Sequence, residues 1–137
     1  MKICITAQGP TLDAPVDSRF GRCANFIFVD PDSMQFSTIP NPGAMASGGA
    51  GIQAAQLIID QGASTVLTGQ VGPNAYNALS AGNVAMFIGV LGTVRNALAQ
   101  FKAGQLTEVT FPTTPAHAGM GRGGGRGGGR GRGRGQG

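Results

Sequence analysis

The sequence predicts an α/β fold, in which helices pack against one sheet, and three observations indicate it. A strand, a Gly-x-x-Gly turn and a helix follow one another twice, in residues 64–82 and 84–104. An isoleucine-rich segment, residues 2–7, is typical of a buried first strand. Residues 25–39 have the pattern of a hairpin. The expected order is β-β-β-α-β-α-β-α, with five strands and three helices.

The first strand leads into a long loop, residues 8–22, whose Gly-Pro, Ala-Pro and Phe-Gly pairs are typical of turns. A loop of this length inside a compact domain is usually functional. Strands over residues 25–29 and 34–39 then form the hairpin. The second of them alternates apolar and polar residues, which predicts an edge strand.

The helices are marked by apolar stripes and by glycines. The first is predicted over residues 50–61 and the second over residues 73–79, with stops at Gly62 and Gly82. The third begins after Thr93 as N-cap and ends at Gly104. The apolar stripes of the first and third helices are Ile52, Ala55, Ile58 and Ile59, and Val94, Ala97, Leu98 and Phe101. Residues 106–111 are a candidate extra strand.

The repeated units place a candidate ligand site at one edge of the sheet. Consecutive βα units give parallel strands, so both Gly-x-x-Gly turns and both helix N-termini are expected at the same edge. If the first strand is central, the strand order reverses between it and the fourth strand. Ligands of open α/β sheets bind at such a reversal, and the loop of residues 8–23 leaves the first strand there.

The glycine turns match neither a Walker loop nor a dinucleotide fingerprint, so a nucleotide is not supported. Taken singly, each turn is most simply a tight connection that needs glycine. Two copies at one edge, with a third helix that also starts at glycines, favour a shared anion site instead. The candidate residues are Gly48, Gly49, Gly69, Gly72, Gly89 and Gly92, with Arg19 and Arg22 as rim charges. Arg95 is expected to be a solvated surface charge.

Soft metal ligands are scattered over the predicted loops. Cys23 follows two arginines, which would lower the pKa of its thiol and suit a soft metal. The sequence nevertheless favours a partly buried structural thiol at this position. Met45, His117 and Met120 are further candidate donors. Cys4 is expected in the core. With one histidine and no base and orienter around any serine, the sequence argues against a hydrolase and favours a binding or carrier protein.

The charge divides the chain into a domain, residues 1–111, and a tail, residues 112–137. Acidic residues slightly outnumber basic ones before the tail, whereas the tail carries five arginines spaced by glycine. Such a composition predicts disorder. No stretch is long enough to cross a bilayer or to act as a signal peptide, and the two cysteines form no spaced pair. We therefore expect a cytoplasmic protein without membrane contact.

Four motifs carry a resemblance to a known family: DSRFGRC at 17–23, GGAGIQAAQ at 48–56, TGQVGPNAY at 68–76 and GTVRNAL at 92–98. Over residues 1–106 the chain resembles the dinitrogenase iron-molybdenum cofactor biosynthesis family, which includes NifX-like proteins, the C-terminal part of NifB and orange proteins. The resemblance implies a three-layer, ribonuclease-H-like fold with a mixed five-stranded sheet and no nuclease activity.

The resemblance also implies a carrier that binds an anionic metal-sulfur cluster without covalent bonds. The short domain and the tail are closer to the orange-protein branch, which implies a molybdenum-copper-sulfide cluster, with an iron-molybdenum-sulfur cluster as the alternative. Some members have histidines in the linker that corresponds to residues 45–49, and this chain has none.

Two other functions stay open. The tail resembles RGG segments, which predicts at most a weak, salt-labile affinity for nucleic acid, because no aromatic residue follows Phe111. The domain could also be a protein-interaction module that assists a Mrp-type P-loop ATPase or another protein partner. Such a protein would be colourless and free of metal.

Overall fold

The computed structural model describes residues 1–44 and 49–111. The predicted disorder of the tail therefore lies outside the described residues. Within them, six strands form one mixed sheet in the order β3-β2-β1-β4-β5-β6. Their bounds are β1 Ile3–Ala7, β2 Asn25–Val29, β3 Phe36–Pro40, β4 Thr65–Leu67, β5 Ala85–Ile88 and β6 Thr107–Val109.

The sheet has the predicted centre and the predicted reversal of strand order. β1 pairs in parallel with β4 and β4 in parallel with β5, whereas β1 pairs antiparallel with β2 and β2 with β3. The chain thus adds β2 and β3 on one side of β1 and then β4, β5 and β6 on its other side. The switch point therefore lies between β1 and β4. The expected edge strand is β3.

The five-strand count was one too low for the described residues. Thr107–Val109, within the candidate extra strand, pairs antiparallel with β5 as β6. Val109 is buried in the same apolar cluster as Met86 of β5, so the pairing covers both the backbone and the side chains of what would otherwise be an edge. Burial of this one residue is the reason that so short a segment becomes a strand.

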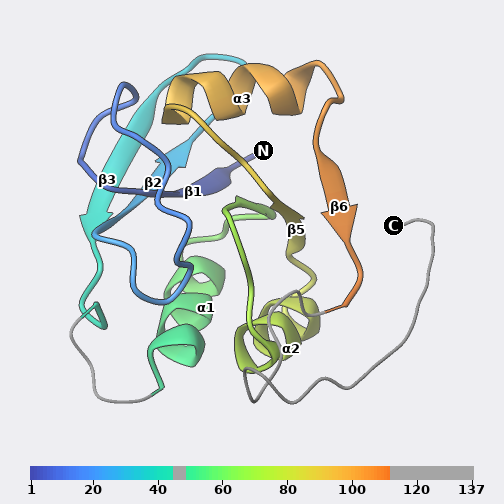
Figure 1. The fold of residues 1–137 in the computed structure, drawn as a ribbon. Coiled ribbons are helices and arrows are strands. Elements are labelled where there is room, and N and C mark those ends of the chain that lie inside the picture. Colours follow the sequence, from blue (N-terminus) through green and yellow to red (C-terminus); the bar gives the residue numbers. More distant parts are fainter. Residues whose placement is uncertain (45–48, 112–137) are drawn as a thin grey trace.

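Three helices cover the sheet in the layered arrangement seen in Figure 1: α1 Ala50–Asp60 and α2 Pro73–Ala81 lie on one face and α3 Val94–Lys102 on the other. Successive side chains of β1 point to opposite faces of the sheet, so the strand contributes to the apolar cluster on each face. Cys4 packs with Ala55 and Ile58 of α1, while Ile3 and Ile5 belong to the apolar cluster under α3. Cys4 is buried in the core as predicted.

The helix ends follow the residues that marked them in the sequence. Thr93 caps α3 through a capping box with Asn96, and Gly104 beyond its end has φ 72°. Gly62 after α1 has φ 79°. One stripe position was wrong: Ile52 is 50% exposed, because α1 buries the face of Ala54, Ala55 and Ile58 instead. None of the helices in the described residues is both long and apolar enough to cross a membrane.

Candidate anion-binding site

The long loop after β1 is fixed across the carboxyl edge of the sheet. Val16 forms a bridge with Ala7, Pro15 with Thr93 and Arg19 with Gln70. These bridges connect the loop to the ends of β1 and β4 and to the start of α3. The loop that the sequence assigned to this edge therefore lies there, with a fixed path.

Two buried threonines hold the loop in place. Thr6 of β1 donates from Oγ1 to the backbone carbonyl of Asp17 at 2.6 Å, and its Oγ1 lies 2.7 Å from the Oγ1 of Thr68, which follows β4. Both threonines are fully buried. Because a buried hydroxyl without a partner is costly, this pair specifies where the loop crosses the strands.

Gly69 is required by this crossing. A Cβ atom built on Gly69 would lie 2.5 Å from the Cα of Ser18, which is too close for any side chain. The backbone N–H of Gln70 donates to the carbonyl of Ser18 at 3.1 Å. The close approach of the loop thus requires the first glycine of the first Gly-x-x-Gly turn, and this glycine is not among the pocket residues.

A pocket of about 490 Å³ opens between the loop and the first turns of α1 and α2. Its lining residues are Ser18, Arg19, Phe20, Gly21, Arg22, Ala50, Gly51, Gln70, Gly72, Pro73, Asn74 and Ala75. Gly21 is tightly placed, since a Cβ atom there would lie 2.8 Å from the backbone nitrogen of Gly51. The loop therefore passes directly over the start of α1.

Two helix N-termini open into this pocket. Gly49 is the N-cap of α1 and Gly72 the N-cap of α2, and neither has a side chain to cap its helix. Among the described residues, no acceptor is found for the backbone N–H groups of Gly51, Asn74 and Ala75. Unpaired amides at the positive ends of two helix dipoles favour a negatively charged ligand.

The N-terminus of α3 is closed by the protein itself. The backbone N–H of Val94 donates to the carbonyl of Ala14 at 2.9 Å, and that of Arg95 donates to the carbonyl of Leu12 at 2.8 Å. The capping box with Asn96 satisfies the next amide. These hydrogen bonds leave the first turn of α3 without the free donors that a ligand would need.

The second glycine turn consequently lies at the predicted edge but outside the pocket. The N–H of Gly89 donates to the carbonyl of Gly69 at 3.0 Å, so the two turns are neighbours, as expected of consecutive parallel strands. Gly89 and Gly92 are not among the pocket residues. Gly49 caps α1 next to the pocket.

Arg19 is held by a buried carboxylate. Its Nε and Nη2 donate to the two oxygens of Asp17 at 3.1 and 3.0 Å, and its backbone N–H donates to the same carboxylate. Burial of Asp17 by itself raises its pKa, but the hydrogen bonds from Arg19 outweigh it, and the pKa lies below the ordinary value of 3.8. Arg19 is therefore positioned at the rim, with its charge partly balanced.

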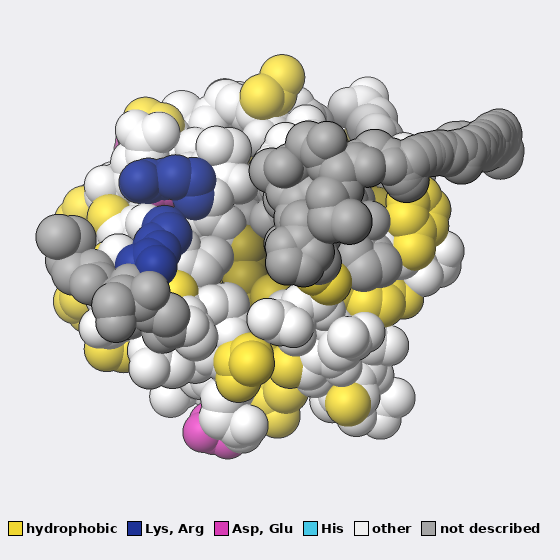
Figure 2. Space-filling view, turned by 60° about the horizontal axis from the view of Figure 1, so that its bottom comes forward, with side chains coloured by type: hydrophobic (Ala, Val, Ile, Leu, Met, Phe, Trp, Pro, Cys, Tyr) yellow, Lys and Arg dark blue, Asp and Glu magenta, His cyan; other side chains and the backbone are white. Residues whose placement is uncertain are grey.

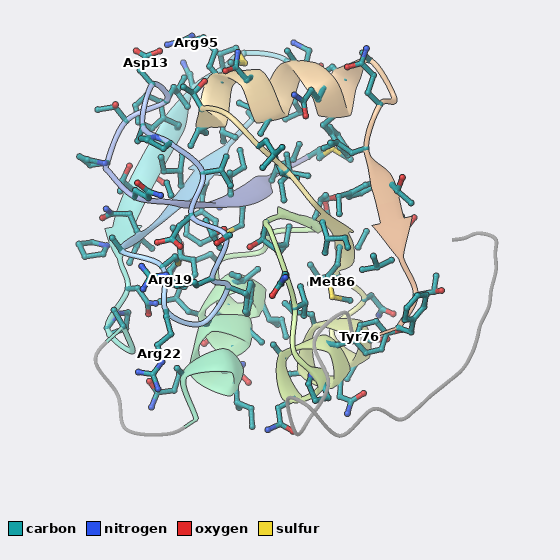
Figure 3. The ribbon with its side chains drawn as sticks, viewed as in Figure 1. Asp13, Arg19, Arg22, Tyr76, Met86 and Arg95 are labelled. Carbon is teal, nitrogen blue, oxygen red and sulfur yellow. The ribbon has the colours of Figure 1, made fainter. Side chains whose placement is uncertain are left out.

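Arg22 is the second rim cation. Its Nη1 donates to the backbone carbonyl of Ala44 at 3.2 Å. Figure 3 shows Arg19 and Arg22 on the same side of the molecule, beside the start of α1. Lys or Arg side chains also gather in one patch in Figure 2, which looks toward the end of the molecule with α1 and α2. The rim charge that the sequence predicted is thus present at the pocket.

Arg95 lies elsewhere, as expected of a surface charge. Its Nε donates to Asp13 at 3.1 Å, in a pair whose side chains are both more than half exposed. Figure 3 shows this pair at the start of α3, on the far side of the sheet from Arg19 and Arg22. An exposed pair of this kind contributes little to stability.

The predicted lowering of the pKa of Cys23 was wrong. Burial, together with the negative charge of Asp17, raises the pKa of this thiol to about 12, against smaller opposing effects of Asn41 and Arg19. The side chain is fully buried in the core cluster that contains Cys4, and both cysteines are free. Cys23 is therefore a buried structural thiol, the interpretation that the sequence favoured.

Nothing in the described part of the chain forms a metal centre. Among residues 1–44 and 49–111 there is no group of three His, Cys, Asp or Glu side chains that could hold a metal ion. Four of the predicted site residues lie outside the described residues, namely Met45, Gly48, His117 and Met120. The pocket accordingly offers amides and guanidinium groups, not thiolates or imidazoles.

The roles of Asn74 in the pocket and of Asn41, which bonds to the loop that lines it, were not predicted from the sequence. Asn41 donates from Nδ2 to the carbonyls of Gly21 and Cys23 at 3.0 and 2.9 Å and so fixes the loop. Its position before Pro-Gly signals only a turn. Asn74 lies in the TGQVGPNAY motif, which carried the resemblance but suggested no role for this side chain.

Comparison with known proteins gives a consistent result. A model of the family described as dinitrogenase iron-molybdenum cofactor matches residues 1–104. The apo form of the orange protein from Desulfovibrio gigas is 41% identical, with a TM-score of 0.80, over 82% of this chain and 96% of that one. A search of curated proteins finds no match.

Two further solved structures are similar. A NifB-type protein from Thermotoga is 31% identical, with a TM-score of 0.69, over 78% of this chain and 91% of that one. A dinitrogenase-like protein from Methanocaldococcus jannaschii is 18% identical, with a TM-score of 0.60, over 82% and 97% of the two chains. The last of these shows a shared fold only.

Proposed function

Because the chain belongs to the dinitrogenase iron-molybdenum cofactor family, we propose that it is a non-catalytic carrier of an anionic metal-sulfur cluster. The cargo binds without covalent bonds in the pocket between residues 18–22 and the first turns of α1 and α2. One observation carries this proposal. Two helix N-termini without side-chain caps, together with Arg19 and Arg22, line the same pocket.

The residues of the pocket fit such a cargo. In a thiometallate the sulfide ions already coordinate the metals, so the protein needs to supply hydrogen-bond donors and positive charge and not ligands. The N–H groups of Gly51, Asn74 and Ala75 and the two arginines are donors of this kind. Metal-ligating clusters are missing from the described residues, which agrees with non-covalent binding.

The branch of the family supports a proposal for the identity of the cluster. A molybdenum-copper-sulfide cluster is the first choice, because the relative that is 41% identical over most of the chain is an orange protein. The linker without histidines also disfavours an iron-molybdenum-sulfur cluster, which stays the alternative. The proposal also includes a cytoplasmic location for the protein. Its fold is proposed to be a ligand-binding version of the ribonuclease-H-like fold.

The decisive measurement is the metal content of the native protein. Protein isolated anaerobically from its own host should have visible absorption bands and contain molybdenum together with copper. Molybdenum with iron would favour the alternative cluster. A colourless protein free of all three metals would contradict the carrier function and favour an interaction module that acts on a Mrp-type P-loop ATPase or another partner.

NMR can locate the site at the same time. Titration with tetrathiomolybdate and copper should shift the amide signals of Gly51, Asn74 and Ala75, whose N–H groups open into the pocket. The amides of Val94 and Arg95 are the internal control, because they are already bonded to the carbonyls of Ala14 and Leu12. Two results would place the cargo elsewhere. One is equal shifts for the pocket amides and for the two control amides of α3, and the other is no shift of the three pocket amides.

The alternative of nucleic-acid binding through the tail makes a different prediction. Deletion of residues 119–137 should abolish any retention of RNA at low salt and leave cluster binding in place, because the pocket residues are unchanged. Loss of the cluster on this deletion would contradict a site at the sheet edge.

A further inference from the structure

Asp17 is a buried charge beside the pocket. Its side chain is 3% exposed, whereas the side chain of Asp13, in the other ion pair of the described residues, is 76% exposed. The backbone of Asp17 is fixed to β1, since its N–H donates to the carbonyl of Thr6 at 2.8 Å and its carbonyl accepts from Thr6 Oγ1 at 2.6 Å. Because removing a carboxylate from water is costly, its burial is explained by the partner that it holds.

The carboxylate of Asp17 fixes one edge of the guanidinium group of Arg19. Nε and Nη2 donate to its two oxygens at 3.1 and 3.0 Å, which is a bidentate contact. Since a guanidinium group is planar and rigid, fixing this edge also fixes the direction of the opposite edge, which carries Nη1. Within residues 1–44 and 49–111, Nη1 has no acceptor. The side chain of Arg19 is 66% exposed and lines the pocket, so these N–H groups are available to a ligand.

An acidic partner has two opposite effects on an anion-binding arginine. The negative charge of Asp17 weakens the attraction that Arg19 exerts on an anion at a distance. At short range the same contact is favourable, because a long side chain that is already held in place loses less rotamer freedom when it binds. If Arg19 acted through its charge alone, a buried carboxylate next to it would only reduce its effect.

Resting on the carrier function above, we propose that Asp17 is a positioning residue, which holds Arg19 so that its Nη1 edge donates to the anion in the pocket. Asp17 itself does not line the pocket and acts only through Arg19. An oriented donor slows the dissociation of the bound anion. The carboxylate does not speed its association, because long-range attraction depends on net charge.

Stopped-flow kinetics with tetrathiomolybdate separate orientation from charge. Asp17→Asn keeps the size of the side chain, but an amide offers one acceptor and one donor where Arg19 needs two acceptors. We expect about five- to tenfold weaker affinity, caused by faster dissociation. Association at low salt should be unchanged or up to about twofold faster, because a negative charge is removed. Tighter binding by Asp17→Asn would overturn the positioning role, since the carboxylate would then act only as a counter-charge.

The matched control is Asp13→Asn. It removes the same charge from the exposed pair with Arg95, which lies on the far side of the sheet from the pocket. Both rates should stay within about twofold of the wild type, because solvent and salt screen this charge. If Asp13→Asn weakened binding as much as Asp17→Asn, net charge would explain both results and the positioning role would be wrong.

A double-mutant cycle distinguishes positioning from a general effect on the loop. In an Arg19→Gln background, Asp17→Asn should change the affinity by less than about twofold, because the donor that Asp17 positions is gone. An equal loss of affinity in both backgrounds would overturn the proposal. Asp17 would then act through the path of the loop and not through Arg19.

Arg19→Lys tests the same role with the carboxylate in place. Lysine keeps the positive charge but cannot form the bidentate contact, so we expect at least about fivefold weaker binding of tetrathiomolybdate. The exposed side chain of Arg19 makes this variant suitable even where Asp17→Asn does not fold. Wild-type affinity of Arg19→Lys would overturn the positioning role alone. If the wild type binds no tetrathiomolybdate, the carrier function and the positioning role fail together.

Discussion

Gly51 of α1 and Ala75 of α2 face each other where the two helices begin: a Cβ atom built on Gly51 would lie 3.3 Å from the Cβ of Ala75. The helix N-termini can therefore stand side by side because one of the two contact residues has no side chain. Figure 1 shows α1 and α2 next to each other on the same face of the sheet. This contact brings two positive helix ends into one pocket.

Replacing Gly51 by leucine should therefore reduce anion binding. The new side chain would fill pocket space or separate the two helix ends, and we expect at least tenfold weaker affinity for tetrathiomolybdate, with a loss of stability of about 1–3 kcal/mol from overpacking. Gln56→Leu is the control, because Gln56 is exposed on the same helix and does not line the pocket. Calorimetric titration measures the affinity and urea unfolding the stability. Wild-type affinity of Gly51→Leu would place the cargo outside this pocket.

Gly69 and Gly72 should differ sharply in their tolerance of alanine, although they belong to the same turn. Gly69→Ala would bring a methyl group within 2.5 Å of Ser18, so we expect destabilisation by about 1–3 kcal/mol or more. At Gly72 nothing lies within 4 Å of a new Cβ atom and φ is −75°, so the change should stay within about 0.5 kcal/mol. Urea unfolding of the two variants gives the comparison, and similar losses would contradict the proposed role of Gly69.

Arg22→Gln should weaken tetrathiomolybdate binding about three- to tenfold at low salt. This is the loss expected when one solvent-accessible hydrogen bond from a charged donor to the ligand is removed. Arg95→Gln removes the same charge from the far side of the sheet, where Arg95 pairs with Asp13. It should leave the affinity within about twofold, because solvent and salt screen a distant exposed charge. Titrations at two salt concentrations compare the variants. Equal effects of both would mean that net charge, and not the rim position, governs binding.

The Asp17–Arg19 pair should make stability depend on pH. Since the pKa of Asp17 is lowered in the folded protein, its contribution is complete above the unfolded value of about 4 and is lost as the pH falls through the lower, folded value. At pH 7 we expect Asp17→Asn to cost about 1–3 kcal/mol, the value of hydrogen bonds to a charged group. The difference from the wild type should shrink as the pH falls below about 4.

Urea unfolding between pH 3 and pH 7 measures this difference. Asp13→Asn is the control, since it breaks an exposed ion pair that is worth less than about 1 kcal/mol. A constant difference between Asp17→Asn and the wild type over the whole range would show that the carboxylate charge is not the cause.

Cys23 should be inert toward alkylation in the folded state. With a pKa of about 12, only about one thiol in ten thousand is ionised at pH 8, and the side chain is fully buried. Mass spectrometry after iodoacetamide treatment should find no label at Cys23 without urea and full labelling with it. Rapid labelling of the native protein would instead support the reactive thiol that the sequence suggested.

The sequence was sufficient for the strand order because the relevant signals are local. Gly62 and Gly104 end helices through their own backbone conformation, and Thr93 forms its cap with a residue three positions away. The reversal of strand order follows from the repeated βα units, whose parallel strands must be neighbours. Thr107–Val109, one of two strands with only three residues, was left out of the count and predicted only as a candidate extra strand.

The site was harder to predict because it depends on contacts between distant segments. Leu12 and Ala14 close the N-terminus of α3 from a loop about eighty residues earlier, and no local signal of α3 announces them. The lowered pKa predicted for Cys23 was wrong for the same reason. The neighbouring arginines in the sequence suggested an exposed thiol in a positive environment, whereas packing buries the side chain. The pairing of Asp17 with Arg19 was not predicted either, although both residues belong to the DSRFGRC motif.

A binding pocket whose described residues offer amides, hydroxyl and guanidinium groups, and no metal-ligating cluster, has a consequence for how its contents leave. No coordinate bond to a described side chain needs to be broken or remade, so departure requires neither a reductant nor a competing thiol. Water and small anions can replace the contacts one at a time. An acceptor that offers true ligands to the metals would then take over the intact cargo, and the direction of transfer would be set by the acceptor's chemistry.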